Sequence, residues 1–263
     1  LGEIYINDAF SSSHRKQASI HKITNFLKEC YGGPLLNKEL NAINMVLKNK
    51  KSPVTCIVGG SKVSTKIGII NSLIEKVDNL VITGAMANNF LAFKGNKIGK
   101  SLIENGSEKI IKDIDQKSSR HKCRIIIPED CSVGKEIDGD FTFKNLSDIS
   151  DDDIILDIGP KTIDTISSII DNSKTVLWNG PAGYFENKNF SNGTTSIAKK
   201  ISENTSNNLL LSIIGGGDTI SAINLYSPKL KFTHLSTAGG AFLEFLEGKS
   251  LPGIEVLKWL NNY

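Results

Sequence analysis

Short apolar runs alternate along the chain with glycine-rich turns and with segments of helical periodicity. Four runs each lead directly into such a turn: 54–58 into Gly59-Gly60-Ser61-Lys62, 80–82 into Thr83-Gly84-Ala85, 175–178 into Asn179-Gly180-Pro181, and 209–214 into Gly215-Gly216-Gly217-Asp218-Thr219. Fully buried strands of a parallel sheet are continuous apolar runs of this kind. Alternation of strands with helices predicts an α/β fold: a doubly wound, mostly parallel, Rossmann-like sheet with helices on both faces.

Apolar positions three or four residues apart predict the helices between these strands. Amphipathic helices are expected over 35–49 and 62–77, and further helices over 85–93, 104–118 and 241–247. The remaining elements are a strand at 123–127, a hairpin over 130–143 around Asp138-Gly139, and strand–helix units that start at Lys174, Asn208 and Phe232.

The first 33 residues have a different character. A short strand at 3–7 precedes a serine-rich turn and the basic segment His14-Arg15-Lys16, and Gly32-Gly33-Pro34 marks a boundary. The chain starts in mid-strand without methionine and without the basic and apolar regions of a signal peptide, so we expect an incomplete sequence.

Composition excludes several classes of function. Of the 263 residues, 39% are hydrophobic and 22% are charged, as expected for a globular protein with a sizeable core. The 31 basic and 28 acidic residues are too balanced for a nucleic-acid surface, and no apolar run is long enough to cross a membrane. Cys56 and Cys123 lie within apolar runs, which predicts buried free thiols and a reducing, cytoplasmic setting.

The glycine turns indicate an anionic ligand, because glycine lets the backbone approach closely and a helix N-terminus offers free N–H groups. Lys62 and Lys66, four residues apart at the start of the predicted helix, would repel each other unless a phosphate lay between them; a solvated lysine face is the alternative. The Walker A pattern is absent. These turns together indicate a phosphate-bearing nucleotide.

Two acidic residues have a functional and an ordinary interpretation each. Asp218 could hold a Mg²⁺ ion on nucleotide phosphates, which needs only one or two protein carboxylates, or it could be a helix N-cap. Glu186, at the end of the rigid turn 179–186, could accept ribose hydroxyls, or the turn could be a plain strand exit. His14-Arg15 could pair with an anion or be ordinary surface.

Six motifs, in their order and spacing, resemble those of the phosphoglycerate kinase family. They are Tyr5-Ile6-Asn7-Asp8-Ala9-Phe10, Gly59-Gly60-Ser61-Lys62-Val63-Ser64-Thr65-Lys66, Leu156-Asp157-Ile158-Gly159-Pro160, Trp178-Asn179-Gly180-Pro181, Gly215-Gly216-Gly217-Asp218-Thr219 and Ser236-Thr237-Ala238-Gly239-Gly240-Ala241. The resemblance extends over the whole chain. It implies two similar lobes joined by a helix, with most of the 3-phosphoglycerate lobe lacking a counterpart here.

By this resemblance the chain divides into four parts: 1–33, the end of the 3-phosphoglycerate lobe; 34–50, the interdomain helix; 51–241, the nucleotide lobe; and 242–263, a segment that returns to the other lobe. The implied reaction is reversible phosphoryl transfer between ATP and 3-phosphoglycerate, which gives 1,3-bisphosphoglycerate and ADP. Mg²⁺ on the nucleotide is the implied metal. We expect a cytoplasmic monomer that binds neither nucleic acid nor membrane.

The resemblance also implies the role of each site residue. The catalytic set, which contacts or neutralises the transferring phosphoryl group, is Lys62, Lys66, Gly216, Gly217, Gly239 and Gly240. The nucleotide set is Gly60, Ser61, Lys62, Lys66, Gly84, Leu156 (on the adenine), Asn179, Pro181, Glu186 (on the ribose), Gly217, Asp218 and Thr219. Asp218 would hold Mg²⁺, and Arg15 would belong to the 3-phosphoglycerate site.

Two other interpretations remain. The chain could be a non-catalytic nucleotide-binding fragment or truncated relative, because much of one lobe has no counterpart. A Rossmann dehydrogenase fits less well, since no G-x-G-x-x-G opens a helix with an acidic residue about 20 residues later.

Overall fold

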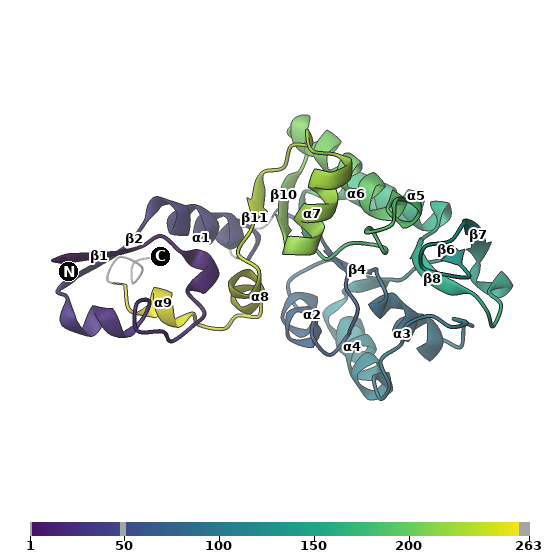
Figure 1. Cartoon of the computed structure of the whole chain (residues 1–263), viewed down its shortest axis with the longest axis horizontal. Helices are drawn as coiled ribbons and strands as arrows, with labels where there is room; N and C mark the ends of the chain where they lie inside the picture. The colour runs from purple at the N-terminus through teal and green to yellow at the C-terminus, as the bar shows by residue number, and fades with distance from the viewer. Residues whose placement is uncertain (1, 48–50, 258–263) are drawn as a thin grey trace.

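A computed structural model describes residues 2–47 and 51–257 (Figure 1). Its largest sheet has six strands in the order β11-β10-β9-β3-β4-β5, and every neighbouring pair is parallel. The strands are β3 (Val54–Val58), β4 (Asn79–Ile82), β5 (Arg124–Ile126), β9 (Thr175–Asn179), β10 (Leu211–Gly215) and β11 (His234–Ser236). The predicted mostly parallel α/β sheet is confirmed.

Helices cover both faces of this sheet (Figure 1). On β3, Cys56 and Val58 pack into one apolar cluster while Ile57, between them, packs into another, because successive strand side chains point to opposite faces. The first cluster includes residues of α2 (Ile67–Ile74), α3 (Met86–Phe93), α4 (Glu108–His121) and α8 (Gly240–Leu246). The second includes residues of α5 (Pro160–Asn172), α6 (Asn192–Ser206) and α7 (Gly217–Tyr226).

A small antiparallel sheet lies beside the main one. β6 (Asp130–Gly134) and β7 (Phe141–Asn145) form the predicted hairpin. β8 (Ile154–Ile158), which was not anticipated, pairs antiparallel with the other edge of β6, and the register shifts between Ser132 and Val133. This pairing places Leu156 and Asp157 next to the main sheet.

The N-terminal part forms a separate parallel pair, β1 (Ile4–Asn7) and β2 (Glu29–Gly32), followed by α1 (Pro34–Leu47). Short 3₁₀ turns at Phe10–Ser12 and Lys22–Phe26 connect the strands. The segment that holds α9 (Pro252–Glu255) returns to this part, where the Asn7 side-chain amide donates to the Gly253 carbonyl over 2.9 Å.

Several expected boundaries were wrong. β2 was not anticipated, and Gly32-Gly33-Pro34 is the direct passage from β2 into α1. The expected end of α1 at residue 49 lies outside the described residues. Residues 62–66 form turns ahead of α2, and α4 begins at Glu108, just beyond Gly106 with its φ of +77°. Cys56 and Cys123 are buried and free, as predicted. Within the described ranges, no helix is long and apolar enough to cross a membrane.

Candidate functional site

The strand order of the main sheet reverses direction between β3 and β9. From β3 the chain continues outward through β4 and β5, whereas β9, β10 and β11 extend to the other side. Open α/β sheets form a crevice at the carboxyl ends of the two strands at such a switch point. Gly59-Gly60 leaves β3 at this edge, and Gly180-Pro181 leaves β9.

The backbones of these turns are in direct contact. The Gly59 amide donates to the Asn179 carbonyl over 2.8 Å, and a Cβ atom on Gly180 would lie 2.2 Å from the Gly59 carbonyl oxygen. Gly180 also has a φ of +98°, which L side chains rarely adopt. Gly84, with a φ of +66°, donates its amide to the Ala182 carbonyl over 3.0 Å. Glycine is therefore required where the turns after β3, β4 and β9 meet.

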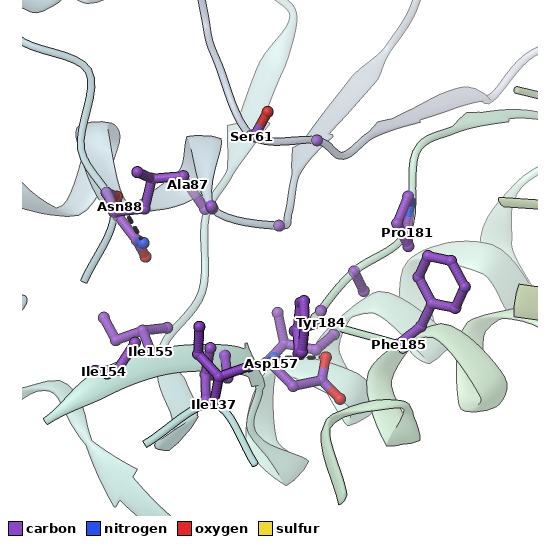
Figure 2. Close-up of a pocket in the computed structure, with 18 of the residues that line it drawn as sticks. Ser61, Ala87, Asn88, Ile137, Ile154, Ile155, Asp157, Pro181, Tyr184 and Phe185 are labelled. Atoms are coloured by element: carbon purple, nitrogen blue, oxygen red, sulfur yellow. Dashed lines mark hydrogen bonds between the residues drawn. The ribbon is translucent and has the colours of Figure 1, made fainter. Parts of the chain in front are cut away.

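A cleft of about 600 Å³ opens beside these turns (Figure 2). Asn88 and Ala87 of α3 lie on one wall, and Ile154, Ile155 and Ile137 lie on the opposite wall. Seven of the predicted site residues line the cleft: Gly60, Ser61, Gly84, Leu156, Pro181, Glu186 and Asp218. The combination of apolar walls with a few polar groups suits a planar organic ligand.

Three polar side chains come together at the start of α7. The Lys66 ammonium donates a hydrogen bond to the Asn179 side-chain oxygen. Burial lowers the pKa of Lys66, while the nearby carboxylate of Asp218 opposes that shift. The buried Asn179 side-chain nitrogen has no hydrogen-bond partner among the described residues. This group offers an ammonium, a free amide donor and a carboxylate side by side.

Asp218 is not the cap of its helix. The N-cap of α7 is Gly216, with a φ of +99°, and Asp218 is exposed in the first helical turn. The N-cap interpretation of Asp218 is therefore wrong, although a carboxylate in the first helical turn still interacts favourably with the helix dipole. The buried Thr219 hydroxyl accepts from the Gly180 amide over 2.8 Å, which ties the start of α7 to the turn after β9.

Lys62 lies outside the helix in which the sequence placed it. It is exposed in the turn 61–65, four residues ahead of the α2 N-cap, Lys66. Of the two lysines, only Lys66 is therefore at the start of the helix. Neither lysine lines the cleft, although Ser61, which precedes Lys62, does.

Three further predicted residues form a second group near α8. Gly239, with a φ of +55°, is the N-cap of α8, and a Cβ atom on Gly240 would lie 3.4 Å from His14 Nε2. The exposed Arg15 donates from Nε to the same His14 nitrogen at 3.5 Å. None of the three lines the cleft, so the structure arranges the predicted residues as two groups.

Asp157 was missed as a site residue. It lines the cleft beside Leu156, is 2% exposed, and accepts the Gly193 amide over 2.7 Å. Burial raises the pKa of Asp157 to about 7, although its backbone hydrogen bonds act in the opposite direction. The only signal in the sequence was a single acidic residue within an apolar strand. The sequence alone does not show whether such a side chain is buried or exposed.

Comparison with known proteins identifies the family. The sequence model described as phosphoglycerate kinase matches residues 1–249. The chain belongs to the phosphoglycerate kinase family. It is 46% identical to the phosphoglycerate kinase of Wolbachia sp. subsp. Brugia malayi (strain TRS), over all of this chain and 66% of the relative. The Bartonella quintana (strain Toulouse) phosphoglycerate kinase is also 46% identical, over 98% of this chain and 65% of the relative.

Solved structures of phosphoglycerate kinases have the same fold. The Coxiella burnetii structure superimposes with a TM-score of 0.92 at 39% identity, over 98% of this chain and 66% of that chain. The Pyrococcus horikoshii OT3 structure gives 0.81 at 28% identity, over 97% of this chain and 64% of that chain. The chain thus spans about two thirds of the length of the phosphoglycerate kinases that it matches.

Proposed function

We propose that this chain forms the nucleotide-binding part of a phosphoglycerate kinase, which transfers a phosphoryl group reversibly between ATP and 3-phosphoglycerate. The carrying observation is the cleft at the β3/β9 switch point, which has apolar walls along β8 and α3. Asp218 lines this cleft and also belongs to the Lys66–Asn179–Asp218 group at the start of α7. The first feature suits a nucleobase and the second suits polyphosphate. Membership of the family supports the same assignment.

In this proposal the nucleotide lies along the cleft. Leu156 packs on the adenine and Glu186, exposed at the rim, accepts ribose hydroxyls. Gly60, Ser61, Gly84 and Pro181 contribute close backbone walls. Lys66, the Asn179 amide, and the first amides of α7 at Gly216, Gly217 and Thr219 face the phosphates.

The reaction needs charge neutralisation and alignment more than proton transfer. A carboxylate oxygen of 3-phosphoglycerate forms a bond to the γ-phosphorus as the bond to the ADP oxygen breaks, so no general base is required. Negative charge is spread over three equatorial oxygens, and fixed cations and amides stabilise it. We assign this role to Lys62, Lys66 and the amides of Gly216, Gly217, Gly239 and Gly240, with Arg15 on the 3-phosphoglycerate.

Asp218 fits the Mg²⁺ ion that accompanies such a nucleotide. Its carboxylate is exposed, lines the cleft and lies within electrostatic reach of Lys66. In the described ranges no cluster of three or more His, Cys, Asp or Glu side chains could hold a metal by itself. A single carboxylate suffices when phosphates and water supply the other ligands, and the bound ion neutralises phosphate charge.

We further propose the division into 1–33, 34–50, 51–241 and 242–263, with the six-stranded sheet as the nucleotide lobe. β1–β2 lies at the opposite end of the molecule from the β6–β8 sheet, and α1 follows β2 (Figure 1). A monomer in the cytoplasm is the simplest state for a glycolytic enzyme of this kind.

Calorimetry with MgADP tests the proposal on residues 1–263 as they stand. We expect saturable binding and a rise in melting temperature, because the cleft and the Lys66–Asn179–Asp218 group both lie at one edge of the six-stranded sheet. Absence of both heat and thermal stabilisation at millimolar MgADP would contradict the assignment.

A non-catalytic nucleotide-binding fragment is the second candidate. It is favoured by the position of Arg15, Gly239 and Gly240 outside the cleft. This candidate predicts the same nucleotide affinity without turnover, so affinity and turnover must be measured separately.

A further inference from the structure

The chain between α3 and α4, residues 94–107, runs alongside α3 and is fastened to it by two buried asparagines. Asn88 donates its side-chain amide to the Leu102 carbonyl over 3.0 Å. The Asn89 side-chain oxygen accepts the Glu104 amide over 2.8 Å and the Ser107 hydroxyl over 3.1 Å. Asn89 is 2% exposed, so water does not compete for these bonds. The backbone of Glu104 therefore has a fixed position relative to α3.

From this position the Glu104 side chain reaches the turn 61–65. Its carboxylate accepts the Ser64 amide over 3.0 Å and also the Ser64 hydroxyl. These two bonds from Ser64 hold the pKa of Glu104 below its usual range, so the group is an ionised acceptor near neutral pH. Hydrogen bonds to a charged acceptor are stronger than neutral ones.

The turn held by Glu104 is the one that carries Lys62. It is closed locally by the Thr65 hydroxyl, which donates to the Lys62 carbonyl over 2.9 Å, and by the Lys66 amide, which donates to Val63 over 2.9 Å. Lys62 itself is exposed and outside any helix, so the turn sets where its flexible side chain starts. The positive charge of Lys62 also acts on Glu104.

We propose that Glu104 is a positioning residue that holds the 61–65 turn, and through it the Lys62 ammonium, against the phosphate end of the cleft. This inference rests on the proposed function, because it assigns the turn to nucleotide phosphate. Glu104 joins two walls of the same cleft, since α3 contributes Ala87 and Asn88 and the turn contributes Ser61. The negative charge of Glu104 repels phosphate, so in this proposal Glu104 promotes nucleotide binding only by fixing the position of the turn.

The negative charge of Glu104 should weaken phosphate binding, whereas its hydrogen bonds to Ser64 should strengthen it, and two substitutions separate these effects. Glu104→Ala removes both the charge and the acceptor, whereas Glu104→Gln removes the charge but keeps an oxygen for the Ser64 amide. Glu108→Gln is the matched control, because Glu108 is an exposed acid four residues later, in the first turn of α4. Each variant would be measured as residues 1–263 by MgADP calorimetry and thermal melting, alone and with Lys62→Met.

We expect Glu104→Ala to weaken MgADP about tenfold, because a displaced Lys62 would lose a phosphate contact equivalent to roughly one charge-assisted hydrogen bond. Glu104→Gln should keep most of the native affinity, and Glu108→Gln should equal the native chain. In the Lys62→Met background the further loss from Glu104→Ala should shrink to less than about twofold, because contacts that act through one group are not additive.

Three results would overturn the inference while leaving the proposed function intact. One is native affinity in Glu104→Ala. Another is tighter binding in both Glu104 variants, which would show that its charge alone matters. The third is an undiminished loss in the Lys62→Met background, which would show that Glu104 acts elsewhere. Failure of the native chain to bind MgADP would contradict the proposed function, and this inference with it.

Discussion

Asp157 is a buried carboxyl group in the wall of the cleft, and its protonation state couples to folding. Burial raises its pKa from the ordinary 3.8 to about 7. Because the folded pKa lies above the unfolded one, the folded protein binds the extra proton between these values. This contribution to stability is full below about pH 4 and is lost as pH rises through 7. The neighbouring titratable groups on β6 are Asp130 and Cys131.

We therefore expect the stability of the native chain, relative to Asp157→Asn, to fall between pH 5 and pH 8. Asn keeps one acceptor for the backbone amides but does not titrate. Urea unfolding at both pH values measures the difference, and Asp164→Asn, an exposed change on α5, controls for net charge. Parallel pH profiles for the native chain and Asp157→Asn would show that this carboxyl group is not coupled to folding.

Asp218→Asn separates a metal ligand from an acid that only favours the helix dipole. Because Gly216 is the N-cap, the substitution leaves the cap intact and should change stability by less than about 1 kcal/mol. We expect MgADP affinity to fall about tenfold or more, while metal-free ADP binds equally or better as a repulsive charge is lost. Calorimetry with and without Mg²⁺ distinguishes the two, and an unchanged magnesium dependence would remove Asp218 from the metal site.

The sequence singled out Lys66, Asn179 and Asp218 because each lies in or next to a glycine turn at a strand end. The structure brings these three side chains together. Asp157 and Glu104 could not be found this way. Their roles depend on partners far along the chain, Gly193 and Ser64, which no local pattern indicates.

The glycines in the turns at the strand ends differ in how much space is available for a side chain in place of the glycine hydrogen. A Cβ atom at Gly180 would lie 2.2 Å from a backbone oxygen at positive φ, whereas Gly217 has nothing within 4 Å. We expect Gly180→Ala to cost about 3 kcal/mol or more of folding free energy, if the protein folds at all. Gly217→Ala, in the first turn of α7, should be neutral or stabilising by about 0.5–1 kcal/mol.

Gly217→Ala should nevertheless weaken MgADP, because its methyl group would occupy the space above the α7 amides. Denaturant unfolding and calorimetry on the same samples test both halves of this prediction. A folded, fully stable Gly180→Ala would contradict the close approach of the turns, and native nucleotide affinity in Gly217→Ala would place the phosphates elsewhere.

The predicted secondary-structure boundaries were wrong where hydrogen bonds to residues distant in sequence take the place of helical hydrogen bonds. Residues 62–66 have helical periodicity, but Glu104 takes the Ser64 amide and hydroxyl, and α2 begins only at Ile67. Likewise Asn89 takes the Glu104 amide, which shifts the start of α4 to Glu108. The pairing of β8 with β6 is another such case, because strand pairing depends on the partner and not on the strand itself.

The molecule as a whole has two sheets of very different completeness. All six strands of the main sheet lie within residues 54–236, so their apolar runs sufficed to predict the fold class. β1–β2 is a two-stranded parallel sheet on which Ile4 and Ile6, on one face, are each 60% exposed. Parallel sheets are normally covered on both faces. Only the resemblance to the family, and not periodicity, assigned this part to a second lobe.

This asymmetry leads to a prediction for the 263-residue chain. In the proposed assignment its cleft holds the nucleotide, whereas only Arg15 and its surroundings, beside an open sheet, are assigned to 3-phosphoglycerate. Without groups that hold the acceptor carboxylate in line with the phosphorus, the activation barrier is not lowered by orientation, an effect worth about 7–11 kcal/mol. We expect MgADP binding with negligible 1,3-bisphosphoglycerate formation in a coupled assay, and partial recovery when the remaining third of a relative is joined to the chain or added separately. Robust turnover by residues 1–263 alone would require a 3-phosphoglycerate site within these residues, with Arg15→Ala as the first variant to test it.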